Sequence, residues 1–292
     1  MLDSASPYGT GSRIVATCTV VRPITCLLAA LSAACGGFLA SDLSRLASVR
    51  GVLSMLCMAG LMGVANAVND IVDLPADRIS KPQRPIASGR VPVYTAWSVV
   101  TALAILTLAT AAALGLAETL LASALLFLAF AYSYRFKDTV FVGNVTVGIV
   151  CCGTLVFGSL TSGRLTPSSG VAAAVILLFV VAYEIVKTLQ DREADSAAGL
   201  RTLATAYEPG VSVAAFTAVA AVLCVTALGV GSPFSSEPVP CLVLLLLFLI
   251  APVGLCAHIL RTWPDRAGST ARSLLILRLA WFPGLLSLTL LK

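Results

Sequence analysis

The chain has 292 residues, of which 58% are hydrophobic and only 11% are charged, and its mean hydropathy is +0.97. This composition excludes a water-soluble globular domain, because such a domain could not avoid exposing large apolar patches. The formal net charge of +5 is explained by basic loops beside a membrane, so it gives no reason to expect a nucleic-acid partner.

Apolar segments long enough to cross a bilayer follow one another along most of the chain. A hydrocarbon core about 30 Å thick requires roughly 20 apolar residues per helix. The segments are continuously apolar, which favours helices over a barrel of alternating strands. The sequence therefore predicts an all-α, multi-pass membrane protein of one domain. Nine helices are expected, at residues 14–40, 50–69, 93–115, 117–134, 140–162, 168–189, 209–231, 240–261 and 271–291.

The first of these segments is too long to be the core of a signal peptide, so it is expected to stay in the mature protein behind a polar tail at residues 1–13. Lys and Arg residues set the expected orientation. Eleven of them fall in the loops after the second, fourth, sixth and eighth helices, and three fall in the other loops between helices. By the positive-inside rule, the N-terminus and the richer loops are expected in the cytoplasm, with the plasma membrane of a prokaryote as the expected location.

Cysteine and histidine are poor candidates for chemistry here. The nine cysteines lie almost entirely within apolar segments and form no CxxC pair, so no disulfide framework is expected. His258 is the only histidine, which argues against a histidine zinc site or a Ser-His triad. Any reaction must therefore depend on carboxylates and cations.

Two acidic stretches begin where apolar helices end. NDIVDLPAD, residues 69–77, follows the second helix, and EIVKTLQDREAD, residues 184–195, follows the sixth. Each contains a DxxxD pair one helical turn apart, although Pro75 is expected to kink or end the first helix. The offset of four helices suggests an internal duplication, with one half at residues 14–134, the other at residues 140–261, and an added ninth helix at residues 271–291.

Two carboxylate clusters that face each other would repel strongly unless a cation lies between them. Oxygen ligands, including the amide carbonyl of Asn69, suit Mg²⁺, which substrate phosphate usually completes. Nearby basic residues, among them Lys81, Arg84 and Lys187, would supply the remainder of a diphosphate site. The alternative is that these charges only mark helix ends at the membrane surface.

These residues also carry a family resemblance. NDIVDLPAD resembles the NDxxDxxxD motif of the UbiA superfamily of intramembrane prenyltransferases, and KPQRPIASG resembles that family's continuation. In the second half, KTLQDREAD and GLRTLAT are similar to the second acidic motif and its downstream segment. Arg22-Pro23, YSYRFK and Gly143-Asn144 match further family positions. The EIVK and RPIxSG segments look most like the digeranylgeranylglyceryl phosphate synthase-like branch.

The resemblance implies a nine-helix bundle in which Mg²⁺, with Mn²⁺ as a possible substitute, grips an isoprenyl diphosphate and stabilises its departure. The chamber around the resulting allyl cation must be dry. The implied metal ligands are Asn69, Asp73, Asp77, Asp191 and Asp195. The implied diphosphate contacts are Arg22, Lys81, Arg84, Arg135, Lys137 and Lys187.

Other positions leave two interpretations open. Tyr132, Tyr134 and Tyr183 could face the cation or the acceptor, or could belong to an aromatic belt at the membrane surface. Asp70 could take the acceptor's proton, which would place it with Asp73 and Asp191 among the catalytic residues, or it could support a metal ligand.

Three functions remain in competition at this stage. The first is transfer of the prenyl group to a lipid or aromatic acceptor. The second is an intramembrane terpene cyclase, which would use the same metal site without an acceptor. The third, a transporter or channel, would explain buried carboxylates but not paired DxxxD motifs flanked by cations.

Overall fold

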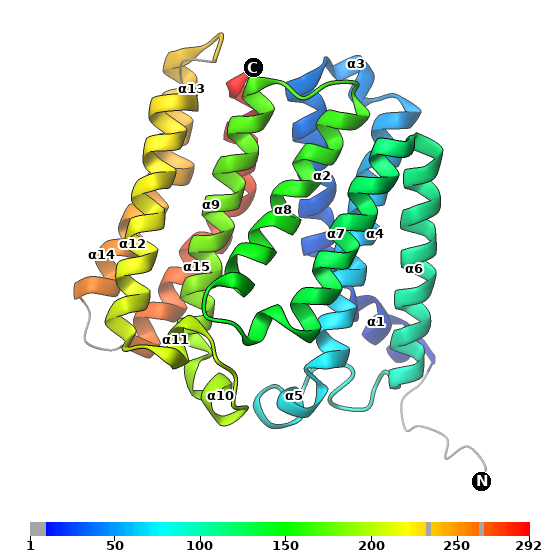
Figure 1. The fold of residues 1–292 in the computed structure, drawn as a ribbon, viewed down its shortest axis with the longest axis vertical. Helices are drawn as coiled ribbons and strands as arrows, with labels where there is room; N and C mark the ends of the chain where they lie inside the picture. Colours follow the sequence, from blue (N-terminus) through cyan, green and yellow to red (C-terminus); the bar gives the residue numbers. More distant parts are fainter. Residues whose placement is uncertain (1–9, 232–234, 263–265) are drawn as a thin grey trace.

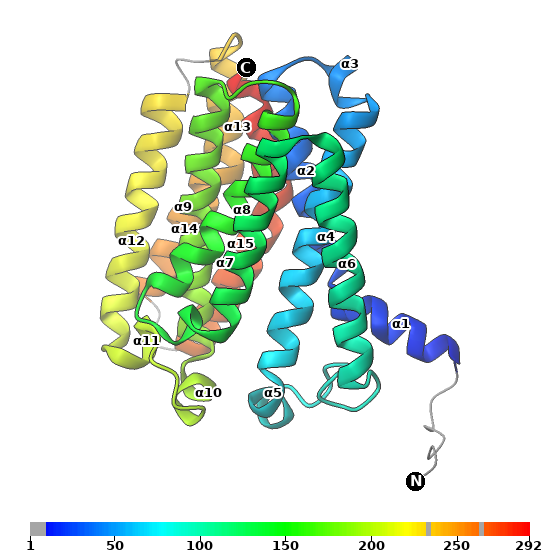
Figure 2. The same cartoon turned by 45° about the vertical axis from the view of Figure 1, so that its right-hand side comes forward.

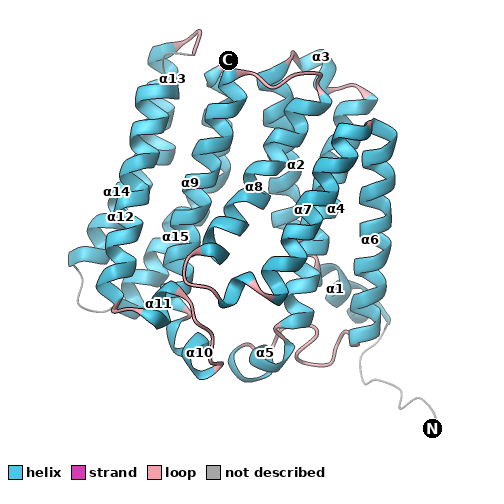
Figure 3. Cartoon of the chain, in the orientation of Figure 1, coloured by secondary structure: helices cyan, strands magenta, loops and turns pink. Residues whose placement is uncertain are grey.

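The computed structural model describes residues 10–231, 235–262 and 266–292, and within these ranges the chain is helical and has no strand (Figure 3). Nine described helices are long and apolar enough to cross a membrane, which confirms the predicted number. They are formed by α2 (Pro23–Ala40), α4 (Val49–Val72), α6 (Val93–Leu114), α7 (Leu116–Tyr134), α8 (Val142–Thr161), α9 (Pro167–Gln190), α12 (Pro209–Val225), α13 (Pro238–Leu245) with α14 (Ala251–Thr262), and α15 (Arg266–Leu288).

Short helices lie at the two ends of this bundle (Figure 1). One end carries α5, α10 and α11, and the opposite end carries α3 and the C-terminus. The N-terminal α1 also lies at the first end, where it runs across the direction of the long helices (Figure 2). The bounds are α1 (Thr10–Val20), α3 (Leu43–Leu46), α5 (Leu74–Ser80), η1 (Phe136–Asp138), α10 (Arg192–Ala197), α11 (Leu203–Ala206) and η5 (Thr289–Leu291).

The first predicted helix, 14–40, is two helices in the structure, and only α2 spans the bundle. The chain turns at Arg22, which has a left-handed backbone with φ 53° and ψ 76°. Pro23 disfavours helical geometry at the residue before it and has no N–H to continue a helix, so α1 and α2 take different directions. Residues 1–9 of the expected polar tail lie outside the described residues.

Helix ends elsewhere follow the local sequence. Thr166 and Ser169 form a reciprocal capping box at the start of α9, and Pro167 occupies its first turn. Gly115, with φ 153°, separates α6 from α7. The eighth span contains a π-helical turn, η4 (Leu246–Ile250), just before Pro252. A proline in the interior of a helix removes one backbone donor, and the widened turn accommodates that loss.

The buried apolar side chains form two clusters that meet at α2 and α8. One cluster gathers side chains of α1, α4, α6 and α7, and the other gathers those of α9, α12, α13, α14 and α15. Both clusters include residues of α2 and α8, which pack against each other. Within each half the contacts follow one order, since α2 packs on α4 and α4 on α6, while α8 packs on α9 and α9 on α12. This is the arrangement that a duplication predicts, and the duplication itself stays a prediction.

Candidate active site

The first acidic motif lies where α4 gives way to α5. Asp73 is the residue between the two helices, and its N–H donates to the carbonyl of Asn69 at 2.9 Å. The N–H of Asp77 in turn donates to the carbonyl of Asp73 at 2.8 Å. The predicted break at Pro75 is therefore present as a change of helix in the preceding turn, and the two carboxylates remain one turn apart.

The second acidic motif repeats this geometry at the end of α9. Asp191 lies between α9 and α10, and its N–H donates to the carbonyl of Lys187 at 2.9 Å. The N–H of Asp195 donates to the carbonyl of Asp191 at 2.8 Å. Both motifs lie at the same end of the bundle, as the positions of α5 and α10 in Figure 1 show. There, residues of α5 and α10 line one small cavity of about 330 Å³.

Cations hold the carboxylates of the first motif. Asp70 is buried on α4 and accepts hydrogen bonds from Arg22 and, at 3.2 Å, from Arg84. Arg84 also donates to the buried carboxylate of Asp77 at 2.6 Å. One guanidinium therefore links two carboxylates, and Asp70 fixes two guanidinium groups at once.

Two lysines reach the residues that end α4 and α9. The ammonium of Lys137 contacts the carboxylate of Asp73, which also accepts from the Asn69 amide at 2.9 Å. Lys81 lies 3.4 Å from the carboxylate of Asp191. In the described part of the chain, no three His, Cys, Asp or Glu residues are already gathered as a metal-binding group.

Negative charge is less well compensated at the second motif. Burial and the neighbouring charge of Asp191 raise the pKa of Asp195 to about 6. Burial also lowers the pKa of Lys137, against the attraction of Asp195 and Asp138. An added cation beside Asp195 would stabilise its ionised form.

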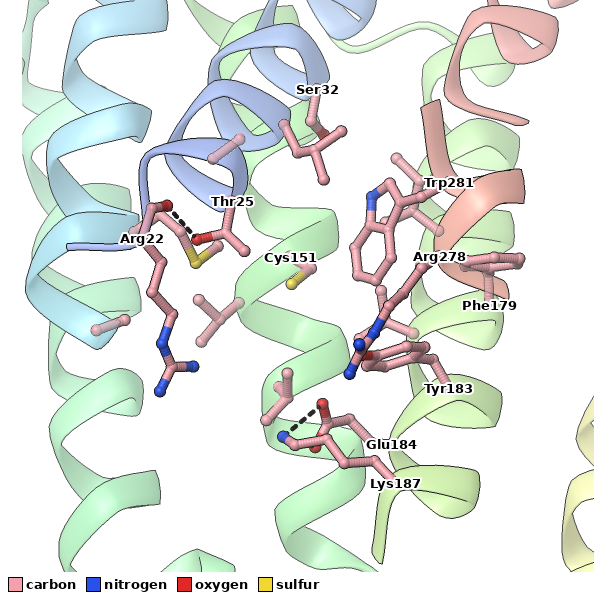
Figure 4. A pocket seen from close by; sticks show the side chains of 18 of the residues that line it. Arg22, Thr25, Ser32, Cys151, Phe179, Tyr183, Glu184, Lys187, Arg278 and Trp281 are labelled. Carbon is pink, nitrogen blue, oxygen red and sulfur yellow. Dashed lines mark hydrogen bonds and ion pairs between the residues drawn. The ribbon is translucent and has the colours of Figure 1, made fainter. Parts of the chain in front are cut away.

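A cavity of about 670 Å³ begins at these motifs and runs into the bundle. Its lining at this end is polar and includes Asn69, Gln190 and Asp191. Deeper in, Phe179 and Trp281 line the cavity. Figure 4 shows Tyr183 between Trp281 and Lys187 along the cavity wall. The cavity therefore combines a charged mouth with an apolar interior.

Most of the predicted contact residues converge on this cavity. Four of the six predicted diphosphate contacts line it, as do two of the three tyrosines; these are Arg22, Lys81, Arg84, Lys187, Tyr132 and Tyr183. Lys137 lines the smaller cavity between α5 and α10. Tyr134 and Arg135 are exposed and do not line the main cavity. Tyr134 is two residues beyond Tyr132, roughly 200° around the helix, so it faces away.

Sequence reasoning missed two residues of α15. Arg278 donates to the hydroxyl of Tyr183 at 3.0 Å, and the ring of Trp281 meets that of Tyr183 edge-on with centroids 5.5 Å apart. Figure 4 shows the three side chains together on one wall of the cavity. An ionisable residue in the middle of an apolar helix was the signal available for Arg278, because such residues rarely face lipid.

Known proteins match both the sequence and this fold. A sequence profile of the UbiA prenyltransferase family matches residues 25–282. A digeranylgeranylglyceryl phosphate synthase from Methanopyrus kandleri is 34% identical over 215 residues, which are 70% of this chain and 74% of the relative.

Two solved structures at 20% identity share the fold. A digeranylgeranylglyceryl phosphate synthase in membranes has a TM-score of 0.71, over 95% of this chain and 97% of that one. A UbiA homolog from Archaeoglobus fulgidus bound to GPP and Mg²⁺ has a TM-score of 0.70, over 94% of this chain and 99% of that one.

These matches confirm the expected fold class and the expected enzyme class, and they leave the transporter alternative without support. The family profile matches most of the chain, with both acidic motifs inside the matched region. It therefore belongs to the UbiA prenyltransferase family, and its nine described apolar helices are those expected of a multi-pass membrane enzyme.

Proposed function

We propose that the chain is a Mg²⁺-dependent intramembrane transferase that ionises an isoprenyl diphosphate and passes the prenyl group to a lipid acceptor. One observation carries this proposal. Asn69 of the first acidic motif and Asp191 of the second line the mouth of a single cavity whose interior is apolar, while Asp73 lines the smaller cavity between α5 and α10. The charged mouth of the cavity matches the diphosphate of a prenyl diphosphate, and the apolar interior matches its long hydrocarbon chain.

The donor set at the mouth fits a hard divalent cation. All the candidate ligands are oxygens, and each motif offers its carboxylates at the junction of two helices. Mg²⁺, or Mn²⁺ in its place, would be held by Asn69, Asp73, Asp77, Asp191 and Asp195. When bound, the cation neutralises the charge of the diphosphate and makes the diphosphate a better leaving group. A UbiA homolog bound to GPP and Mg²⁺ supports this assignment.

Basic residues at the mouth hold the diphosphate oxygens. Arg22 and Arg84 are oriented by the buried carboxylate of Asp70, so their remaining N–H groups are fixed for phosphate. This arrangement favours a positioning role for Asp70 over the role of a base. Lys81 pairs with Asp191 and Lys137 pairs with Asp73. Both lysines would be free to contact the diphosphate if those carboxylates held the metal.

The interior of the cavity protects the allylic cation. Apolar side chains exclude the water that would convert the cation to an alcohol. Tyr132 and Tyr183 both line this space, and their ring faces attract positive charge. Tyr134 is exposed and has no part in this role.

Relatives named digeranylgeranylglyceryl phosphate synthase support transfer over cyclisation. That name describes a glyceryl phosphate with two prenyl chains, so the acceptor class we propose is a prenylated glyceryl phosphate. The cation-rich end of the bundle, with both motifs, is proposed to face the cytoplasm.

The test is a product assay with protein purified into nanodiscs. Geranyl, farnesyl and geranylgeranyl diphosphates are supplied with Mg²⁺ and with glycerophosphate ethers, quinols or aromatic acids. The expected product has the mass of acceptor plus prenyl group, and excess EDTA stops its formation. Efficient formation of a cyclic hydrocarbon from the diphosphate alone would overturn the proposal in favour of a terpene cyclase.

A further inference from the structure

We propose that Arg278 is the residue that recognises the acceptor, by binding an anionic, phosphate-type headgroup inside the cavity. This inference rests on the proposed function and names the acceptor chemistry that the same site selects. It rests on the depth of Arg278 in the bundle, on its having no carboxylate partner among the described residues, and on its position relative to the acidic motifs.

Arg278 lies deep in a membrane-spanning segment. It is ten residues beyond Gly268 in the span Gly268–Leu291, which corresponds to about 15 Å along the helix. A guanidinium at this depth is costly unless it faces a polar partner or a cavity. Arg278 lines the main cavity, and its side chain lies beside Tyr183 (Figure 4).

The cations that line the cavity differ in their partners. Arg22 and Arg84 pair with Asp70, Lys81 pairs with Asp191, and Lys187 pairs with Glu184 at 2.9 Å.

Arg278 alone among these lining cations has no ion pair within the described residues, and its hydrogen bond to the neutral Tyr183 hydroxyl leaves its charge uncompensated. The cavity therefore offers one positive charge that the protein itself does not neutralise.

The surroundings hold Arg278 in a defined orientation. Its Nε donates to Tyr183, which leaves both terminal nitrogens of the guanidinium fork for a ligand. Trp281, one turn along α15, packs edge-on against both Tyr183 and Phe179, with centroids 5.5 and 5.7 Å apart. A preorganised fork of this kind suits two oxygens of one phosphate.

The position of Arg278 separates this site from the diphosphate site. Tyr183 and Lys187 on α9 and Asp191 just beyond its end are spaced i, i+4 and i+8, so they lie along one face. Tyr183 is about 12 Å from Asp191 along the helix axis. In the proposed function, the diphosphate of the donor would lie at the level of Asp191. An anion at Arg278 would therefore belong to the second substrate, whose nucleophile must approach the prenyl carbon between the two levels.

The experiment compares two acceptors that differ only in the phosphate group, a prenylated glyceryl phosphate and the same ether with a free hydroxyl in place of phosphate. Arg278→Gln should raise the KM for the phosphorylated acceptor by about 10- to 100-fold, because one charge-assisted contact is lost. The KM for prenyl diphosphate and the rate with the neutral acceptor should change less than about twofold, and Arg278→Lys should restore part of the affinity. Arg261→Gln removes an exposed cation of α14 and serves as the matched control.

A binding measurement separates this inference from the proposed function. In an Asp191→Asn background, titration with the phosphorylated ether followed by tryptophan fluorescence should still report binding, and Arg278→Gln should remove it. The inference is wrong if Arg278→Gln raises the KM for the prenyl diphosphate instead, or if it raises the KM for both acceptors equally. It is also wrong if added anionic phospholipid displaces the phosphorylated acceptor. A chain that binds the phosphorylated ether through Arg278 but makes no adduct would refute only the proposed function.

Discussion

The ammonium of Lys81 lies 3.4 Å from the carboxylate of Asp191, so the end of α5 in the first half is tied to the end of α9 in the second. The pair is only partly exposed, at 34% for the Lys81 side chain and 27% for that of Asp191. Lys81 therefore competes with a divalent cation for one of the proposed ligands.

Replacing Lys81 with methionine should tighten Mg²⁺ binding to the protein in the absence of diphosphate. An ion pair of this exposure contributes up to about 1 kcal/mol, which corresponds to about fivefold in Kd. Titration calorimetry measures the affinity, and the Mg²⁺-dependent rise in melting temperature reports it independently. The same variant should raise the KM for the prenyl diphosphate, because one of its oxygen contacts is lost.

Arg78→Met is the control for this change, since Arg78 is an exposed cation of the same short helix with no ion pair among the described residues. It removes the same charge from the same end of the bundle. Equal gains in Mg²⁺ affinity for both variants would mean that general electrostatics, and not competition at Asp191, sets the affinity.

Helix positions could be predicted from the sequence because membrane thickness fixes the length of an apolar segment. The break between α1 and α2 could not, since residues 14–40 are apolar on both sides of Arg22 and the change of direction depends on one left-handed residue before Pro23. The π-helical turn η4 was missed for a similar reason: Pro252 predicts a lost hydrogen bond but not how the backbone accommodates it.

The two acidic motifs could be placed at one end of the bundle because they follow the second and the sixth membrane spans, and all even-numbered spans end on the same side. Which lysine meets which carboxylate could not be predicted, since Lys81 and Asp191 are 110 residues apart and meet through loop conformation. Tyr134 was included among the candidate cavity residues because it is a tyrosine. That it points away from the cavity follows only from its angular position on the helix relative to Tyr132. Arg278 carried a signal in its membrane depth, but its partner Tyr183 is set by tertiary packing.

Asp73→Asn and Asp191→Asn should each lower turnover by about 100-fold or more, because each removes a charged ligand from a different half of the site. Asparagine keeps the shape of the side chain, so both variants should stay folded in the membrane. Release of diphosphate from geranylgeranyl diphosphate measures turnover. Glu193→Gln, an exposed acidic residue of α10, is the control and should keep near wild-type activity. A rate within tenfold of wild type for either Asp variant would contradict a site shared by both motifs.

Gly158→Ala should destabilise the bundle by about 1–3 kcal/mol, which is the usual cost of overpacking. A Cβ at this position would lie 1.8 Å from the carbonyl oxygen of Ala33, and the atoms in its way are backbone atoms that cannot move aside. Gly36 faces Leu155 in the same way, so α2 and α8 are held in close backbone contact. Thermal unfolding in detergent measures the loss.

Gly170→Ala is the matched control, because a Cβ there meets nothing within 4 Å. It replaces glycine within α9, so stability should hold or rise by up to about 1 kcal/mol. Similar melting temperatures for Gly158→Ala and wild type would show that α2 and α8 can separate without cost.

Single cysteines at Ser80 and Ser44 should be labelled from opposite sides of the membrane by an impermeant thiol reagent. Both residues are exposed, and the 24-residue α4 separates their helices, with α3 at one end of the bundle and α5 at the other (Figure 1). The nine native cysteines are first replaced with alanine. Eleven Lys and Arg residues on the Ser80 side against three on the other predict that Ser80→Cys reacts only in inverted vesicles and Ser44→Cys only in intact cells. The reverse pattern would place both acidic motifs outside the cell, and labelling of both positions from one side would contradict the membrane span of α4.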